Sequence, residues 1–132
     1  MIESFTIARL AQSAGVHVET VRYYQRLRLI PRPERPVGGV RRYTSSDTER
    51  LRFIKRAQAM GFTLGEMSSL LDLKDRRSCR ATRQLARAKL QAIDAQLRSL
   101  RALRAELAAL VAECGSNSDD TQCPVIDRLA RV

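Results

Sequence analysis

The sequence predicts a mainly α-helical protein in which a small N-terminal domain is followed by one long helix. Two short amphipathic segments meet at Gly15, and two helices joined by a tight turn that contains glycine form a helix-turn-helix. A stretch with three prolines and a Gly-Gly pair follows, in which no helix can continue. From Cys79 to Cys114 the chain contains neither proline nor glycine and is rich in good helix formers. Together these observations predict a winged helix-turn-helix domain and a long C-terminal helix.

The helix-turn-helix is predicted at residues 7–14 and at about residues 18–27. Thr6 can cap the first helix, and Gly15 ends it. In the second helix, apolar residues at three-residue spacing are expected to point into the core. These are Val21, Tyr24 and Leu27.

The opposite face of the second helix is the predicted DNA-reading surface. The second helix of such a motif enters the major groove, where its outward side chains contact bases and phosphates. The residues expected to do so are Thr20, Arg22, Tyr23 and Arg26.

Residues 31–43 are expected to form a small β wing. The Gly-Gly pair at 38–39 lies between two valines and is typical of the turn of a tight hairpin. After the turn, Arg41 and Arg42 are placed to bind the DNA backbone beside the groove. Tyr43 is expected to pack beneath the wing against the next helix. Beyond the wing, two further cations fit phosphate contacts and a solvated surface equally well: Arg50 and Lys55.

Two capping boxes predict where the next two helices begin. In such a box a Ser or Thr side chain and an acidic side chain three residues later each accept a hydrogen bond from the other's backbone amide. Ser46 with Glu49 is expected to open one helix. Thr63 with Glu66 is expected to open another, which runs to about Leu71. The first of these helices should bury the stripe of Leu51, Ile54, Ala57 and Met60.

The long helix requires a partner. At about 1.5 Å per residue it is about 50 Å long, and a helix of that length beside a small domain cannot cover its own apolar stripe. The stripe alternates spacings of three and four, as in the seam of a coiled coil. The simplest partner is the same helix of a second copy, so we expect a homodimer. Gly115 is expected to end the helix, before a last apolar turn at residues 125–129. The stripe comprises Leu90, Ile93, Leu97, Leu100, Leu103, Leu107 and Leu110.

Positive charge is concentrated in the N-terminal part. The net charge is +10, and residues 1–60 contribute 12 Lys or Arg against 5 Asp or Glu. Such an excess is expected for a protein that binds a polyanion such as double-stranded DNA. No apolar run is long enough to span a membrane and no signal peptide is evident, so we expect a cytoplasmic protein without membrane contact. One His, no phosphate-binding glycine loop and no paired carboxylates argue against an enzyme.

The three cysteines are expected to form a metal site shared between subunits. Cys114 and Cys123 bracket an eight-residue loop that can fold back and place both sulfurs on one ion. Sulfurs bound to one metal lie about 4 Å apart, whereas Cys79 is a whole helix away from Cys114. An antiparallel helix pair brings the start of one helix beside the end of the other. We therefore expect Cys79 of one subunit to join Cys114 and Cys123 of its partner, rather than three unrelated thiols.

Three thiolates favour a soft ion, and the third thiolate favours a divalent one over copper(I). Mercury(II) accepts a trigonal thiolate site readily, and lead(II) or cadmium(II) are alternatives. Zinc usually takes four ligands, to which Asp119 and Asp120 would have to contribute. A redox switch formed by a disulfide between Cys114 and Cys123 is a further alternative, although it leaves Cys79 without a role.

Three blocks of the sequence resemble the MerR family of transcription regulators: VETVRYYQ at 18–25, RRY at 41–43 and MGFTL at 60–64. The resemblance extends over essentially the whole chain. It implies a dimer joined by long antiparallel helices. It also implies binding to a promoter whose spacer is too long, with the effector causing the protein to bend and underwind the DNA so that RNA polymerase engages both promoter elements.

Within that family the chain is most similar to the mercury-resistance regulators, which share the eight-residue loop and an ending such as Cys123-Pro124-Val125-Ile126. This similarity implies activation by mercury(II). One departure is that Arg80-Ala81-Thr82-Arg83 follows the first cysteine, where these regulators often carry acidic residues. We therefore expect a DNA-binding domain at 1–75, a linker and dimerisation helix at 76–114, and a metal-binding loop with a short helix at 115–132.

Overall fold

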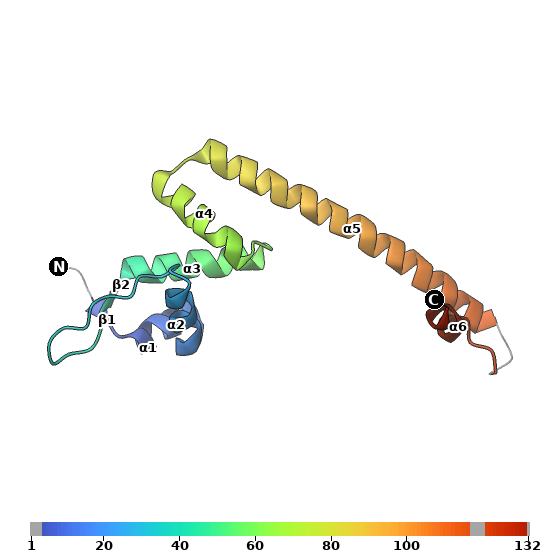
Figure 1. Ribbon diagram of the computed structural model, residues 1–132, viewed down its shortest axis with the longest axis horizontal. Coiled ribbons are helices and arrows are strands. Elements are labelled where there is room, and N and C mark those ends of the chain that lie inside the picture. Colours follow the sequence, from blue (N-terminus) through green and yellow to red (C-terminus); the bar gives the residue numbers. More distant parts are fainter. Residues whose placement is uncertain (1–3, 117–120, 132) are drawn as a thin grey trace. The chain divides into compact units, whose positions relative to one another are not determined.

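The computed structural model describes residues 4–116 and 121–131 and is mainly helical, as predicted (Figure 1). The chain divides into two compact units, with the boundary between Arg83 and Gln84. The elements in chain order are β1 (Ser4–Phe5), α1 (Ile7–Ala14), α2 (Val18–Arg26), β2 (Tyr43–Thr44), α3 (Ser45–Ala59), α4 (Leu64–Arg76), α5 (Cys79–Ser116) and α6 (Pro124–Ala130).

The first unit contains the predicted helix-turn-helix. The Thr6 side chain caps α1 by accepting a hydrogen bond from the Arg9 amide, and Gly15 ends the helix in a left-handed conformation with φ 69°. Val21 and Tyr24 are buried, as expected. Leu27 is 42% exposed, so its predicted place in the core is wrong. The reason is that α2 ends at Arg26, which turns the next side chain away from the buried face.

The predicted β hairpin does not form in the described structure of residues 31–43. The backbone turns where the Gly39 amide donates to the Pro36 carbonyl at 3.0 Å, but no strands flank this turn. Proline has no amide hydrogen for a strand ladder, and the segment contains three of them. Strand β2 pairs antiparallel with β1 instead, with Phe5 opposite Tyr43. The wing is therefore a loop closed at its base by an N-terminal strand.

Helices α3 and α4 begin at capping boxes, one of which differs from the prediction. Thr44 and Asp47 form the box of α3, so the predicted pair of Ser46 and Glu49 is wrong by two residues. The box of Thr63 with Glu66 is confirmed. The helix that it opens, α4, runs to Arg76 rather than to about Leu71. Of the stripe expected on α3, Leu51, Ile54 and Ala57 are buried, whereas Met60 is 69% exposed at the end of the helix.

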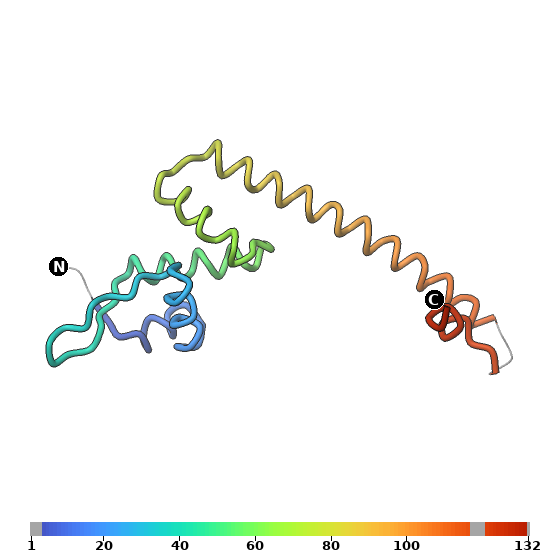
Figure 2. Tube along the Cα trace, in the orientation of Figure 1, coloured from blue at the N-terminus to red at the C-terminus, as the bar shows by residue number. Residues whose placement is uncertain are grey.

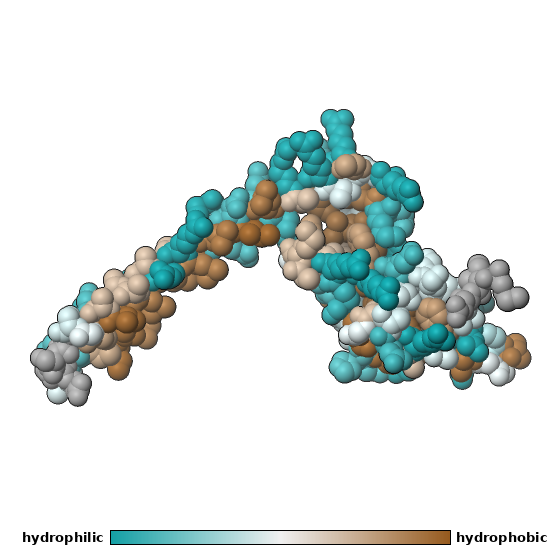
Figure 3. Space-filling view, turned by 180° about the vertical axis from the view of Figure 1, so that it is seen from behind, coloured by the Kyte–Doolittle hydropathy of each residue, from teal (hydrophilic) through white to brown (hydrophobic). Residues whose placement is uncertain are grey.

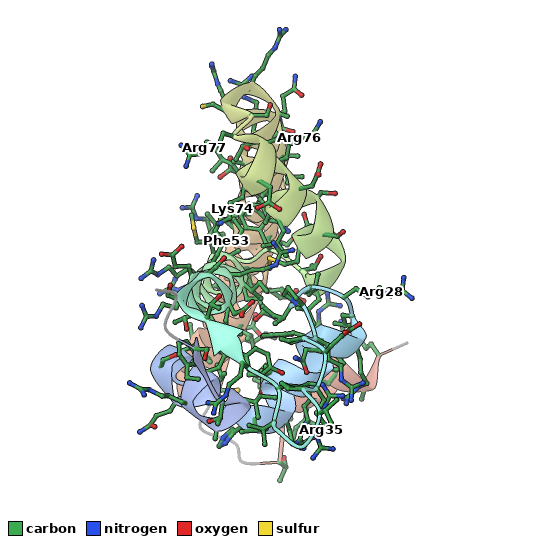
Figure 4. All side chains as sticks on the ribbon, turned by 90° about the vertical axis from the view of Figure 1, so that its left-hand side faces the viewer. Arg28, Arg35, Phe53, Lys74, Arg76 and Arg77 are labelled. Atoms are coloured by element: carbon green, nitrogen blue, oxygen red, sulfur yellow. The ribbon has the colours of Figure 1, made fainter. Side chains whose placement is uncertain are left out.

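A basic side chain of α3 connects two helix ends within the first unit. Arg50 donates from Nε to the Leu29 carbonyl at 2.6 Å and forms an ion pair with Asp75 at 3.5 Å. Leu29 follows the end of α2, and Asp75 lies in the last turn of α4. Nearby, the Lys74 ammonium lies 5.8 Å from the centre of the Phe53 ring, and both residues are labelled in Figure 4. Arg50 is thus occupied inside the fold, while Lys55 is exposed.

The second unit is built on α5, whose helical trace is unbroken in Figure 2. The helix continues through Gly115 to Ser116, so the prediction that this glycine ends it is wrong. No residue of α5 is buried in the single chain, and Figure 3 shows hydrophobic side chains lining it on the face in view. Helix α6 is joined to α5 by an ion pair between Arg128 and Glu106 at 2.8 Å. Among the described residues, no helix is both long and apolar enough to cross a membrane.

Candidate nucleic-acid interface and thiol ligands

The outward face of α2 carries the residues predicted to read DNA. Arg22, Tyr23 and Arg26 are exposed, and Thr20 is half-buried. Arg22 forms an ion pair with Glu19 at 2.7 Å, and the guanidinium of Arg26 lies 5.7 Å from the centre of the Tyr23 ring. Both contacts restrict long side chains at the surface, so the face is partly ordered before any partner binds.

A basic groove lies between α2 and the segment of residues 31–43. It has a volume of about 680 Å³ and is lined by five arginines and by no acidic residue. We refer to these five residues as the arginine groove. Low-dielectric walls lined by one sign of charge concentrate the electrostatic field, so such a groove attracts phosphate groups. The five are Arg22, Arg26, Arg32, Arg35 and Arg41.

Arg32 and Arg35 were missed by the sequence analysis. Both lie beside prolines in a segment that was interpreted as part of a hairpin. The Arg35 side chain instead turns back and donates from Nε to the Gly39 carbonyl at 3.0 Å, which stabilises the tip of the loop. The only sequence pattern that pointed to these residues was that each lies next to a proline in the segment 31–36.

Arg41 has a polar atom that lacks a partner. Its Nε is buried and forms no hydrogen bond with the described residues. An unsatisfied buried donor costs about 1–3 kcal/mol. Arg42, the other predicted wing residue, is exposed and does not line the groove.

The loop is attached to α2 through Gln25, which the sequence analysis did not identify. Gln25 donates from Nε2 to the Tyr43 hydroxyl at 2.7 Å and to the Pro31 carbonyl at 3.2 Å. Tyr43 is buried, as predicted. One amide therefore holds both ends of the 31–43 segment against the helix.

Another tyrosine of α2 holds this helix to α3. The Tyr24 hydroxyl donates to the Gln58 side chain at 2.6 Å. Desolvation on burial raises the pKa of Tyr24 above its ordinary value of 10.0. The phenol is therefore a neutral donor at physiological pH.

Two of the three cysteines lie at the ends of α5, and the third directly precedes α6. Cys79 is the exposed first residue of α5, and Cys114 is half-buried in its last turn. Cys123 is half-buried and precedes α6, where its carbonyl accepts from the Asp127 amide at 2.9 Å. All three are free of disulfides. Residues 117–120 of the loop, including the aspartates considered as zinc ligands, lie outside the described residues.

No single chain brings these thiols together. Across residues 4–116 and 121–131, no group of three His, Cys, Asp or Glu side chains is arranged to hold a metal ion. Cys79 and Cys114 lie on one continuous helix, whose rise per residue places them about 50 Å apart.

Comparison with known proteins gives consistent matches over the chain. A family model described as "MerR HTH family regulatory protein" matches residues 5–74, and one described as "MerR, DNA binding" matches residues 48–110. A mercuric resistance operon regulatory protein of Serratia marcescens is 41% identical over 128 residues, which cover 97% of this chain and 89% of that protein.

Two solved structures are similar over nearly the whole length. A transcription regulator from Ralstonia metallidurans CH34 in complex with lead(II) has a TM-score of 0.80 and 34% identity, covering 98% of this chain and 100% of that one. A dual-function regulator from Bacillus megaterium MB1 in complex with mercury(II) has a TM-score of 0.73 and 39% identity, covering 96% and 100%. All these matches are DNA-binding transcription regulators, which confirms the predicted fold and the prediction that the chain is not an enzyme.

Proposed function

We propose, from the premise that this chain belongs to the MerR family of helix-turn-helix regulators, that it is a mercury(II)-responsive regulator that binds promoter DNA as a homodimer. In this proposal Cys79 of one subunit and the partner's Cys114 and Cys123 bind the metal. The metal-bound dimer distorts the promoter so that RNA polymerase initiates, and the protein acts in the cytoplasm, where promoter DNA lies.

The observation that carries the proposal is the position of the thiols at both ends of one uninterrupted helix. Three soft sulfur donors without disulfides suit a soft divalent ion. Since one helix separates Cys79 from Cys114, only pairing with a second copy unites them. In such a dimer the metal binds where the ends of two helices meet, so metal binding acts directly on the subunit interface.

Heterodimers test the shared site. A dimer of the Cys79→Ser variant has no intact site, and neither has a dimer of the Cys114→Ser variant. A mixed dimer contains one site with all three sulfurs. We expect each variant alone to bind the operator but not to respond to mercury(II), and the mixture to recover binding of one ion per dimer. Full response by Cys79→Ser alone would overturn the shared site.

Lead(II) is the second candidate ion, because the structure is more similar to the lead(II) complex, at a TM-score of 0.80, than to the mercury(II) complex, at 0.73. Relatedness in sequence to a mercuric resistance regulator favours mercury. Promoter transcription measured against mercury(II), lead(II), cadmium(II) and zinc(II) decides between them. Half-maximal activation at the lowest concentration by lead(II) would reassign the effector.

The arginine groove supports the DNA-binding part. Arg41→Gln removes one positive charge and the unsatisfied Nε. We expect weaker operator binding and a shallower dependence of the binding constant on salt, since each phosphate contact contributes about one unit of slope. Arg131→Gln, which removes the same charge after α6, serves as the control and should leave both quantities unchanged. Equal effects of the two variants would contradict a role for the groove.

A further inference from the structure

Charge is unevenly distributed along α5. Residues 79–93 of this helix carry four basic side chains and no acidic one, and residues 105–116 carry two acidic side chains and no basic one. The first 15 residues of the helix are therefore positive and its last 12 are negative, while the segment between them carries Asp94 and three further arginines, at 98, 101 and 104. The side chains concerned are Arg80, Arg83, Arg87 and Lys89 at the start and Glu106 and Glu113 at the end.

This distribution is unfavourable for α5 as a single helix. The helix dipole places partial positive charge at the N-terminus and partial negative charge at the C-terminus, so acidic residues stabilise the first turn and basic residues the last. Helix α4 follows this rule, with Glu66 in its first turn and Lys74 and Arg76 in its last. Helix α5 has no acidic residue in its first turn and no basic residue in its last.

The apolar side chains of α5 are exposed in the single chain, so the helix needs a partner. Their spacing is nearly the same when counted forward from Cys79 and backward from Cys114. Leu90 lies as far after Cys79 as Leu103 lies before Cys114, and each is more than half exposed in the single chain. Ile93 and Leu100 are related in the same way. Such a stripe suits a second copy in either direction about equally, so it does not by itself select an orientation.

We propose that the charge distribution of α5 selects the antiparallel orientation of two copies. The inference rests on the homodimer proposed above and adds what determines its geometry. Paired helices lie about 8–10 Å apart, which is close to the screening length at physiological salt. In a parallel pair, the two positive starts lie side by side and repel each other, and the two negative ends do the same. In an antiparallel pair, each positive start lies beside a negative end, and the two helix dipoles also attract.

The same register accounts for the thiols. When Cys79 lies beside the partner's Cys114, Arg80 lies at the level of the partner's Glu113. Arg87 lies at the level of the partner's Glu106. The same register places Lys89 at the level of the partner's Arg104, so two attractive pairs stand against one repulsive pair at each end. The electrostatic preference and the proposed metal site therefore favour the same arrangement. The mercury-resistance regulators often carry acidic residues after the first cysteine, whereas this chain carries arginines there. In this arrangement those arginines take part in subunit pairing.

Charge reversal in the full-length, metal-free, reduced protein tests this inference. A start-reversed variant carries Arg80→Glu and Arg87→Glu, and an end-reversed variant carries Glu106→Lys and Glu113→Lys. A doubly reversed variant carries all four changes. Glu106→Gln is the control, because it loses the ion pair with Arg128 without adding charge. The dimer dissociation constant is measured by sedimentation at low and at physiological salt, with helix content by circular dichroism.

We expect each singly reversed variant to dimerise at least about tenfold more weakly than the wild type at low salt, with the difference reduced by added salt. The doubly reversed protein should recover, because opposite charges again meet only in an antiparallel pair; in a parallel pair it repels as before. An equimolar mixture of the two singly reversed variants should also dimerise, even if each alone is poorly folded. If neither the doubly reversed protein nor the mixture recovered dimerisation, the inference would be overturned. A dimer indifferent to all reversals would do so too, while leaving the proposed function intact; a monomeric wild type would instead remove the proposed homodimer.

Discussion

Gln25 donates a hydrogen bond to the Tyr43 hydroxyl at 2.7 Å, which joins the DNA-reading helix to the base of the loop that follows it. Both residues line the arginine groove, but Gln25 is half-buried whereas Tyr43 is only 1% exposed. The two ends of this bond therefore differ in access to DNA, although both set the position of the loop. This difference makes it possible to separate positioning of the loop from direct contact with DNA.

Tyr43→Phe removes the acceptor hydroxyl from a side chain that is only 1% exposed, so it changes little of the surface that DNA can reach. A typical hydrogen bond contributes about 1 kcal/mol, so we expect operator affinity to fall about fivefold if the bond holds the loop in its binding position. Affinity is measured by fluorescence anisotropy of labelled operator DNA.

Gln25→Leu provides the second arm of that experiment. It loses the bonds to Tyr43 and to the Pro31 carbonyl, so its effect should be larger. The double variant should be no weaker than Gln25→Leu alone, because the shared bond can be lost only once. Additive losses would show that Gln25 and Tyr43 act independently.

Arg32 is expected to bind phosphate, because it lines the groove and forms no part of the core. Arg32→Gln should weaken binding to specific and nonspecific DNA by similar factors and lower the salt slope by about one. Lys55→Gln removes an equal charge from an exposed position on α3 outside the groove. If Lys55→Gln lowered the slope as much, the phosphate-binding surface would extend beyond the groove onto α3.

Alkaline pH should destabilise the first unit through Tyr24. Because the pKa of Tyr24 is raised in the folded protein, the unfolded chain ionises first as the pH increases. The stabilising contribution is complete below the unfolded pKa of about 10 and is lost as the pH rises toward the folded pKa. Urea unfolding between pH 8 and pH 11 measures it. Tyr24→Phe should be less stable at pH 8 and show a smaller decline; an unchanged decline would assign it to other groups.

The sequence predicts helices well where the determining contacts are local. Thr63 and Glu66 form a capping box within four residues, and the neighbouring chain offers no competing pair. Before α3, two overlapping boxes are available, and Thr44 is selected because Phe5 pairs with Tyr43 and holds the preceding backbone extended. That contact joins residues far apart in the sequence and leaves no periodic pattern.

The functional surfaces divide in the same way. The outward face of α2 follows from helical periodicity, and its four residues lie on the surface or at its edge. Arg32 and Arg35 reach the groove only through the path of an irregular loop, which no period describes. The separation of Cys79 from Cys114 follows from the length of α5, whereas the metal site proposed for them depends on a second copy.

Arg77 provides a final prediction, about backbone strain beside the first thiol. Arg77 has φ 52° and ends α4, where its amide donates to the Lys74 carbonyl at 3.3 Å. Side chains disfavour this left-handed conformation and glycine adopts it freely, so Arg77→Gly should raise the free energy of unfolding by roughly 0.5–1 kcal/mol. Arg77→Ala removes the same charge and keeps the strain, so it should bring no gain. Thermal and urea unfolding of both variants measure the difference. Equal stability of the two would mean that the conformation at Arg77 carries no strain.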